Sequence, residues 1–209
     1  SFEDFISKNN NYIIQKAFFF GAVLFRDFKM NEQIFENGVN KFNLKNYNSI
    51  GSAAPRSRIS GSVYTANDSP PSEKIPMHHE MAQQQNPPSY IFFSCETPAT
   101  KFGETPIINS KELARFIKNK HKSQFLKLKK GVYYTRVMPR NDNPKSALGR
   151  GWENTFGKSR KKELECFLKK SDMQFEWMEN DVLKVKTSLV PAIRKCHRTN
   201  RETFFNSII

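Results

Sequence analysis

The chain has 209 residues, among them 19 phenylalanines and three cysteines, and a formal net charge of +14. That length suits one domain able to bury a core, and no apolar run reaches the about 18 residues that suggest a transmembrane helix. The cysteines are few, odd in number and without a C-x-x-C pair, which argues against a disulfide framework or a zinc module. Together with an acidic start, which is unlike a signal peptide, these features predict a cytoplasmic protein with reduced thiols.

The positive charge is unevenly placed, because residues 1–110 are neutral overall and residues 111–209 carry the whole excess. A basic half can attract nucleic acid or other anionic partners. The simpler interpretation is a lysine-rich, solvated surface. No nucleic-acid-binding motif accompanies the lysines, and aromatic residues are not interleaved with them, so nucleic-acid binding is the disfavoured hypothesis.

The first part of the chain predicts two helices and a strand. An amphipathic helix is expected over residues 1–15 and a strand over residues 22–28. Asn31 suits the N-cap of a second helix. In that helix the apolar residues follow helical spacing, at Ile34, Phe35, Val39 and Phe42.

A long polar connection rich in serine, asparagine and arginine follows over residues 47–68. Connections of this length in compact domains are usually functional or disordered. Arg56 and Arg58 are candidates to meet an anionic substrate or a carboxylate that supports the site. An ordinary surface arginine is an equal alternative for each.

The most informative stretch is residues 75–109, which opens with His78, His79 and Glu80. Side chains of an extended segment alternate between faces, so His78 and Glu80 should point one way and His79 the other. An imidazole and a carboxylate side by side are two of the three protein ligands of a facial-triad iron(II) site. His79 is better suited to packing or to supporting a ligand. An apolar strand is expected at residues 91–95, with Cys95 buried in the core.

The rest of the chain predicts helices followed by paired strands. Ser110 suits the cap of a helix in a lysine-rich region that stops at Gly131, where His121 is a solvated side chain. Ser159 suits the cap of another helix. The expected strands, which suit a jelly-roll with helical additions, are residues 132–138, 174–177, 182–186, 188–195 and 203–209.

Residues 75–109 resemble the iron(II)- and 2-oxoglutarate-dependent dioxygenases of the taurine dioxygenase type, the TauD/TfdA family. The ordered motifs that carry the resemblance are His78-x-Glu80, Pro87-Pro88, Ile91–Cys95, Pro98-Ala99 and Gly103-Glu104-Thr105-Pro106. Phe102 stands where the family usually has a first glycine, which should change the turn before Thr105 without removing it. Segments elsewhere, such as Phe20–Phe28 and Gly149–Trp152, fit the same family in order.

The resemblance implies a mainly β fold with added helices, a double-stranded β-helix or jelly-roll. His78 and Glu80 would be ligands of Fe(II), and the Thr105 hydroxyl would contact a carboxylate of 2-oxoglutarate. The implied reaction is hydroxylation of a small-molecule substrate with dioxygen, coupled to decarboxylation of 2-oxoglutarate to succinate. No membrane partner is expected.

The family also has a distal histidine ligand and a following arginine that pairs with 2-oxoglutarate, and neither pattern is found here. We therefore expect a single domain over residues 1–209 that stops before this distal segment and lacks C-terminal strands. The alternative to an enzyme is a catalytically inactive jelly-roll that serves as a binding module. The coding sequence beyond Ile209 would separate the two, and the sequence specifies neither the substrate nor the oligomeric state.

Overall fold

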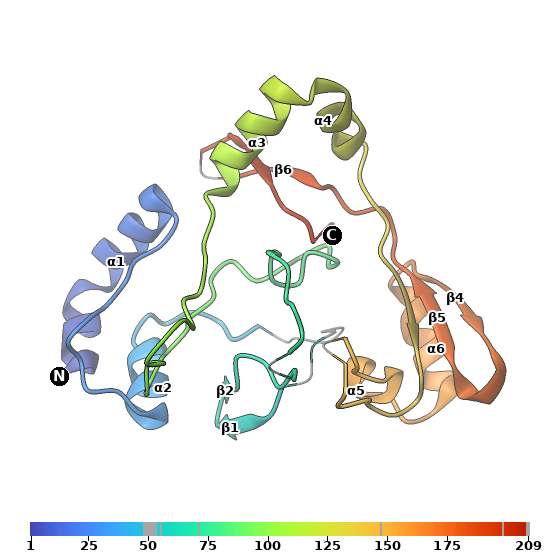
Figure 1. Ribbon diagram of the computed structural model, residues 1–209, viewed down its shortest axis with the longest axis horizontal. Coiled ribbons are helices and arrows are strands. Elements are labelled where there is room, and N and C mark those ends of the chain that lie inside the picture. Colours follow the sequence, from blue (N-terminus) through green and yellow to red (C-terminus); the bar gives the residue numbers. More distant parts are fainter. Residues whose placement is uncertain (48–53, 55, 71, 147, 198, 208–209) are drawn as a thin grey trace. The chain divides into compact units, whose positions relative to one another are not determined.

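The computed structural model describes residues 1–47, 54, 56–70, 72–146, 148–197 and 199–207 (Figure 1). The chain divides into two compact units, each described here by itself. Unit 1 is Ser1–Asn48, Arg56–Asn67 and Ser89–Thr105, and unit 2 is Ser49–Pro55, Asp68–Pro88 and Pro106–Ile209. The expectation of a single dioxygenase-like domain stays a prediction.

Two helices form the core of unit 1. Helix α1 (Phe2–Phe20) begins with a capping box between Ser1 and Asp4. In α2 (Glu32–Asn40), the Asn31 side chain accepts a hydrogen bond from the amide of Ile34 at 2.8 Å. Both predicted helices are therefore confirmed. Their shared core consists of Phe2, Ile6, Ile13 and Phe42, with partly buried side chains around them.

Two strands predicted in unit 1 are wrong. Residues 22–28 form no strand, and their phenylalanines pack edge-on against Phe2 instead, at ring-centroid distances of 5.7 Å for Phe25 and 5.2 Å for Phe28. Residues 91–95 also form no strand, Phe93 is 61% exposed, and Cys95 is exposed rather than buried. A strand needs a partner for its backbone hydrogen bonds, and among the described residues of this unit only β1 (Arg58–Ser60) and β2 (Val63–Tyr64) pair.

A three-stranded antiparallel sheet with two helices forms the larger core of unit 2, which we call the sheet module (residues 135–186). The strand order is β3-β5-β4, with β3 at Thr135–Met138, β4 at Gln174–Trp177 and β5 at Leu183–Lys186. The helices are α5 (Trp152–Phe156) and α6 (Lys161–Lys170). The predicted hairpin of β4 and β5 is confirmed, with a short 3-10 helix, η1 (Glu179–Asp181), at its turn. The buried core consists of Met138, Trp152, Phe156, Leu164, Leu168, Leu183 and Val185.

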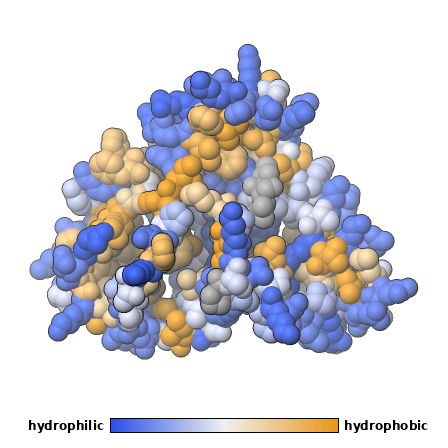
Figure 2. Space-filling model, viewed as in Figure 1, coloured by the Kyte–Doolittle hydropathy of each residue, from blue (hydrophilic) through white to orange (hydrophobic). Residues whose placement is uncertain are grey.

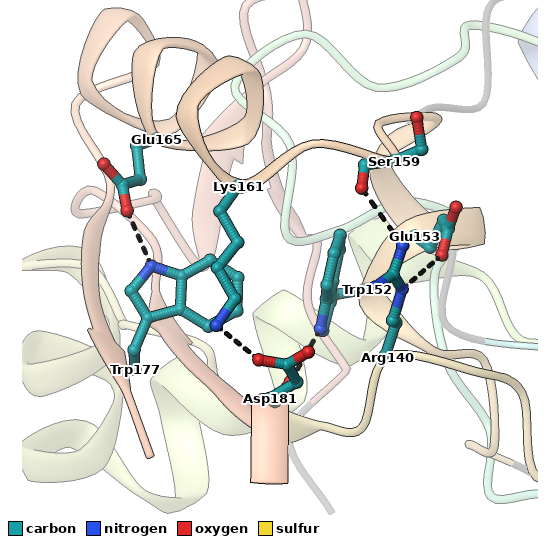
Figure 3. A network of polar contacts seen from close by, with 8 residues as sticks. All are labelled: Arg140, Trp152, Glu153, Ser159, Lys161, Glu165, Trp177 and Asp181. Atoms are coloured by element: carbon teal, nitrogen blue, oxygen red, sulfur yellow. Dashed lines mark hydrogen bonds and ion pairs between the residues drawn. The ribbon is translucent and has the colours of Figure 1, made fainter. Parts of the chain in front are cut away.

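Two tryptophans join this core to polar partners (Figure 3). Trp152 is completely buried, packs edge-on against Trp177 at 5.4 Å, and donates its indole hydrogen to the Asp181 carbonyl at 2.8 Å. Trp177 donates in the same way to Glu165 at 2.8 Å. Since a buried indole N–H without a partner would cost free energy, these two bonds let large apolar rings fill the core without that cost.

In another part of unit 2, two helices pack against a short β-hairpin. The N-cap of helix α3 (Ser110–Lys120) is Asn109, one residue before the predicted cap Ser110, and α4 (Lys122–Lys129) follows. Strands β6 (Ile193–Lys195) and β7 (Glu202–Phe204) pair antiparallel, which confirms the last predicted strand pair in part of its length. Figure 2 shows hydrophilic residues along the outer edge of α3 and α4, with a hydrophobic area beside them. Two lysines of these helices, Lys118 and Lys129, bind Glu202 at 3.0 and 2.8 Å.

The architecture of the described residues is mixed, with more residues in helices than in strands. Its sheets have two or three strands and none is closed into a barrel. The described part of the chain therefore does not show a mainly β fold. The jelly-roll remains an expectation from the family resemblance. Within those same residues, no helix combines the length and the apolar character needed to cross a membrane.

Candidate functional site

The candidate site lies in unit 2 on an irregular segment, residues 75–88, which we call the His78 segment. It contains no strand, and a tight turn follows Glu80. Met81 has a φ of 54°, in the left-handed region, and the amide of Ala82 donates to the His79 carbonyl at 3.3 Å. Met81 and Ala82 are buried, so the turn anchors its apolar side chains in the unit and leaves the residues before it near the surface.

His78 and Glu80 lie on the same side of this segment. Nε2 of His78 is 4.0 Å from Oε2 of Glu80, and the two side chains are 45% and 21% exposed. Nδ1 of His78 lies 2.8 Å from the carbonyl oxygen of Pro76. Because a carbonyl can only accept, Nδ1 carries the proton in this contact, and in the tautomer with a single proton Nε2 is the nitrogen that keeps a lone pair.

This arrangement brings two potential metal ligands near each other. At the about 2.1 Å bond length typical of nitrogen and oxygen ligands to zinc, two ligand atoms at right angles on one ion lie about 3.0 Å apart, so a metal ion would draw Nε2 and Oε2 about 1 Å closer than the 4.0 Å between them in this structure. Histidine ligands of metals almost always donate their second ring N–H to a carbonyl or carboxylate, as His78 does to Pro76. Within the described ranges, no group of three His, Cys, Asp or Glu side chains is placed to hold a metal, so these residues supply a pair rather than a triad.

His79 faces the other way and is held by contacts within unit 2. Its Nδ1 lies 3.2 Å from the Asn206 carbonyl and its Nε2 lies 2.6 Å from the Ser110 hydroxyl. The ring packs on Phe205 at 4.7 Å, and burial lowers the pKa of His79. Both ring nitrogens contact polar atoms of the protein, so His79 attaches the His78 segment to α3 and to the chain after β7.

The remaining predicted residues belong to unit 1. Arg58 donates from Nε to the Gly61 carbonyl at 2.7 Å, within the turn between β1 and β2. Arg56 is half-buried, and Thr105 is exposed. His78 and Glu80 belong to unit 2, so these three residues are described separately from them.

Two successive residues before Thr105, Phe102 and Gly103, lie in the left-handed region of backbone conformation. Phe102 has a φ of 60° and is 87% exposed, and Gly103 has a φ of 88°. A non-glycine residue in this left-handed conformation costs about 1–2 kcal/mol. No hydrogen-bonded turn is assigned to residues 101–105, so the expected altered turn stays a prediction.

Sequence reasoning missed one residue that contacts the His78 segment. Arg194 of β6 donates to the carbonyls of Gln84 and Gln85, at 2.9 and 3.3 Å, across sequence separations of 110 and 109 residues. An isolated arginine in a short strand has no local signature for such a contact. Only the pairing of β6 with β7 and the path of the His78 segment bring the groups together.

Comparisons with known proteins agree on one family. A family model described as taurine catabolism dioxygenase TauD, TfdA family matches residues 2–207. The chain is 40% identical over 191 residues to a clavaminate synthase-like protein of Arabidopsis thaliana, covering 90% of this chain and 58% of that protein. It is 30% identical over 190 residues to the dapdiamide synthesis protein DdaC of Enterobacter agglomerans, covering 90% and 55%. The chain thus spans little more than half the length of these curated relatives.

Proposed function

Because the chain belongs to the TauD/TfdA family of iron(II)- and 2-oxoglutarate-dependent oxygenases, we propose that it supplies the first two iron ligands of an oxygenase that hydroxylates a small molecule. The co-substrates are 2-oxoglutarate and dioxygen, and succinate is the co-product. The double-stranded β-helix of the family is part of the same proposal. So are the substrate class and the activity of the whole protein, because the chain spans 58% or less of each relative.

The observation that carries the proposal is the geometry of His78. Its Nδ1 is fixed by the Pro76 carbonyl at 2.8 Å, and its Nε2 faces Glu80 at 4.0 Å. A neutral imidazole and a carboxylate form part of the donor set of a two-histidine, one-carboxylate iron site. The backbone carbonyl sets the tautomer, so the nitrogen that faces Glu80 is the one able to bind a metal.

The chain's residues would have distinct roles. His78 and Glu80 hold the iron, and the Pro76 carbonyl orients His78. The Thr105 hydroxyl donates to a carboxylate of 2-oxoglutarate, and Arg56 or Arg58 meets an anionic group; these three assignments rest on the resemblance. The bound iron, with 2-oxoglutarate and dioxygen, supplies the oxidising chemistry, and the protein positions the groups and excludes water.

Metal binding by single variants tests the pair directly. Mn(II), a divalent stand-in for iron, can be titrated into the protein and its unbound fraction followed by electron paramagnetic resonance. H78A and E80A should each weaken binding at least about 10-fold, since even supporting groups of metal ligands contribute 10–100-fold. H121A is the matched control, because His121 is an exposed histidine between α3 and α4 and should leave the affinity unchanged.

Turnover separates the enzyme from the binding module. With Fe(II) and candidate substrates, the enzyme produces succinate in a reaction that H78A and E80A abolish. Unchanged Mn(II) affinity in both variants contradicts the ligand assignment. Metal binding that depends on His78 and Glu80 without any substrate-coupled succinate, in a protein extended to the relatives' full length, supports the binding module instead.

A further inference from the structure

The His78 segment carries the candidate metal ligands without the support of a β-ladder. None of residues 75–88 belongs to a strand. Polar contacts made by side chains must therefore do much of the work that backbone pairing does elsewhere in unit 2. These contacts fall into two groups, one on each side of Glu80.

The first group attaches the segment at His79. The imidazole contacts Ser110 and the Asn206 carbonyl, and the Ser207 hydroxyl donates to the His79 carbonyl at 3.2 Å. These bonds hold the residue between the two candidate ligands. They do not restrain the chain after the turn at Met81.

The second group attaches the segment at residues 84 and 85. The Arg194 guanidinium donates from Nη2 to the Gln84 carbonyl at 2.9 Å and from Nη1 to the Gln85 carbonyl at 3.3 Å. Its Nε donates to the Pro191 carbonyl at 3.3 Å, which fixes the guanidinium against the chain just before β6. The Gln85 side chain adds a bond to the Ser188 hydroxyl at 2.9 Å.

Phe205 connects the two groups. The Arg194 guanidinium lies 4.5 Å from the centroid of the Phe205 ring, and the His79 ring lies 4.7 Å from the same ring. Among the described residues no carboxylate lies within ion-pair distance of Arg194, and burial lowers the pKa of this side chain. The cation is therefore held by carbonyl oxygens and an aromatic face, a use that suits the planar fork of arginine.

We propose that Arg194 is a positioning residue for the metal pair: stacked on Phe205, it holds the backbone of residues 84 and 85 and so fixes the turn that presents Glu80 beside His78. It touches neither the metal nor a reacting atom. Its effect passes through the backbone carbonyls that it binds. The part of this inference that concerns metal binding rests on the proposed function.

The experiment compares R194K with R201K in the same protein. Lysine keeps the charge but replaces the rigid fork by a single ammonium, which cannot reproduce the three-carbonyl contact. Arg201 is exposed and precedes β7 in the same hairpin. R201K therefore makes the same substitution nearby and serves as the control. F205L, which keeps an apolar side chain but removes the ring beneath both Arg194 and His79, should reproduce R194K.

Two readouts are needed. Amide hydrogen exchange should rise about 10-fold in residues 80–86 of R194K and F205L, with no change in the sheet module. Mn(II) affinity should fall about 10-fold in both variants, the lower end of the effect expected for groups that orient metal ligands. R201K should change neither quantity.

The outcomes separate this inference from the proposed function. Faster exchange in residues 80–86 without any Mn(II) binding by the parent protein supports the positioning role and contradicts the assignment of His78 and Glu80 as metal ligands. Unchanged exchange and affinity in R194K overturn the positioning role. So does an exchange increase spread equally over the sheet module, because that pattern reports general destabilisation.

Discussion

The sheet module and the His78 segment belong to the same unit but are held by different forces. In the sheet module, β3 and β4 both pair with β5, and seven buried side chains form a common core. In the His78 segment, a few hydrogen bonds, one aromatic ring and the buried side chains of Met81 and Ala82 hold the backbone. In the sheet module, many contacts share the stabilisation. In the His78 segment, the position of the candidate ligands depends on a few side chains. Substitutions in the two regions should therefore differ in kind.

The largest expected effect is the loss of Trp152 from the sheet module. Trp152→Ala removes a completely buried ring and its bond to the Asp181 carbonyl, and should lower the free energy of unfolding by about 3–5 kcal/mol. Urea unfolding followed by circular dichroism measures this change. Val137→Ala, on the same sheet but exposed, should cost far less. Equal losses in the two variants would show that the packing around Trp152 does not hold the module.

An intermediate effect is expected at His79. His79→Ala removes two ring hydrogen bonds and the contact with Phe205, and should lower the free energy of unfolding by about 1–3 kcal/mol. The neighbouring His78→Ala removes a half-exposed ring and should change it by less than about 0.5 kcal/mol. Thermal and urea unfolding of the two variants test the contrast. A larger loss in H78A than in H79A would reverse the assigned packing and ligand roles.

The smallest effect is expected at Glu202, which joins α3, α4 and β7. Bonds from Lys129 and Lys118 lower the pKa of Glu202 from its ordinary 4.5. The stabilisation is thus fully present above about pH 4.5 and is lost as the pH falls through the lowered folded-state pKa. Glu202→Gln should cost up to about 1 kcal/mol at neutral pH and nothing once the carboxylate is protonated.

Unfolding free energies of wild type and E202Q across this pH range provide the measurement. Glu176→Gln is the control, because Glu176 pairs with Lys184 at 3.5 Å with both side chains largely exposed, and it should cost less. A cost for E202Q that does not shrink below pH 4 would contradict the ion-pair explanation.

Local signals in the sequence predicted what depends on neighbours in the chain. The cap at Asn31, the helical spacing after it and the alternation in Gln174–Trp177 all specify elements that need no distant partner. The alternation argument also placed His78 and Glu80 on one side and His79 on the other, as the 4.0 Å separation and the Ser110 contact show. Their roles as ligands remain a proposal.

The missed strands and the missed arginine share one cause, which is dependence on distant partners. The apolar runs at residues 22–28 and 91–95 have strand-like composition, but a strand forms only where another edge is available. Arg194 could not be identified because its carbonyl partners lie more than a hundred residues away. Of the candidate site, two neighbouring residues were predictable from their spacing, while the framework that positions them was not.

The hydrogen bonds from Arg194 to the backbone have a consequence for how this region can change through evolution. Carbonyl oxygens are present whatever amino acid occupies positions 84 and 85, so replacement of either glutamine leaves the acceptors in place. The positions just beyond the candidate metal ligands can then acquire new side chains, and with them new preferences for what is bound, while the ligands keep their geometry.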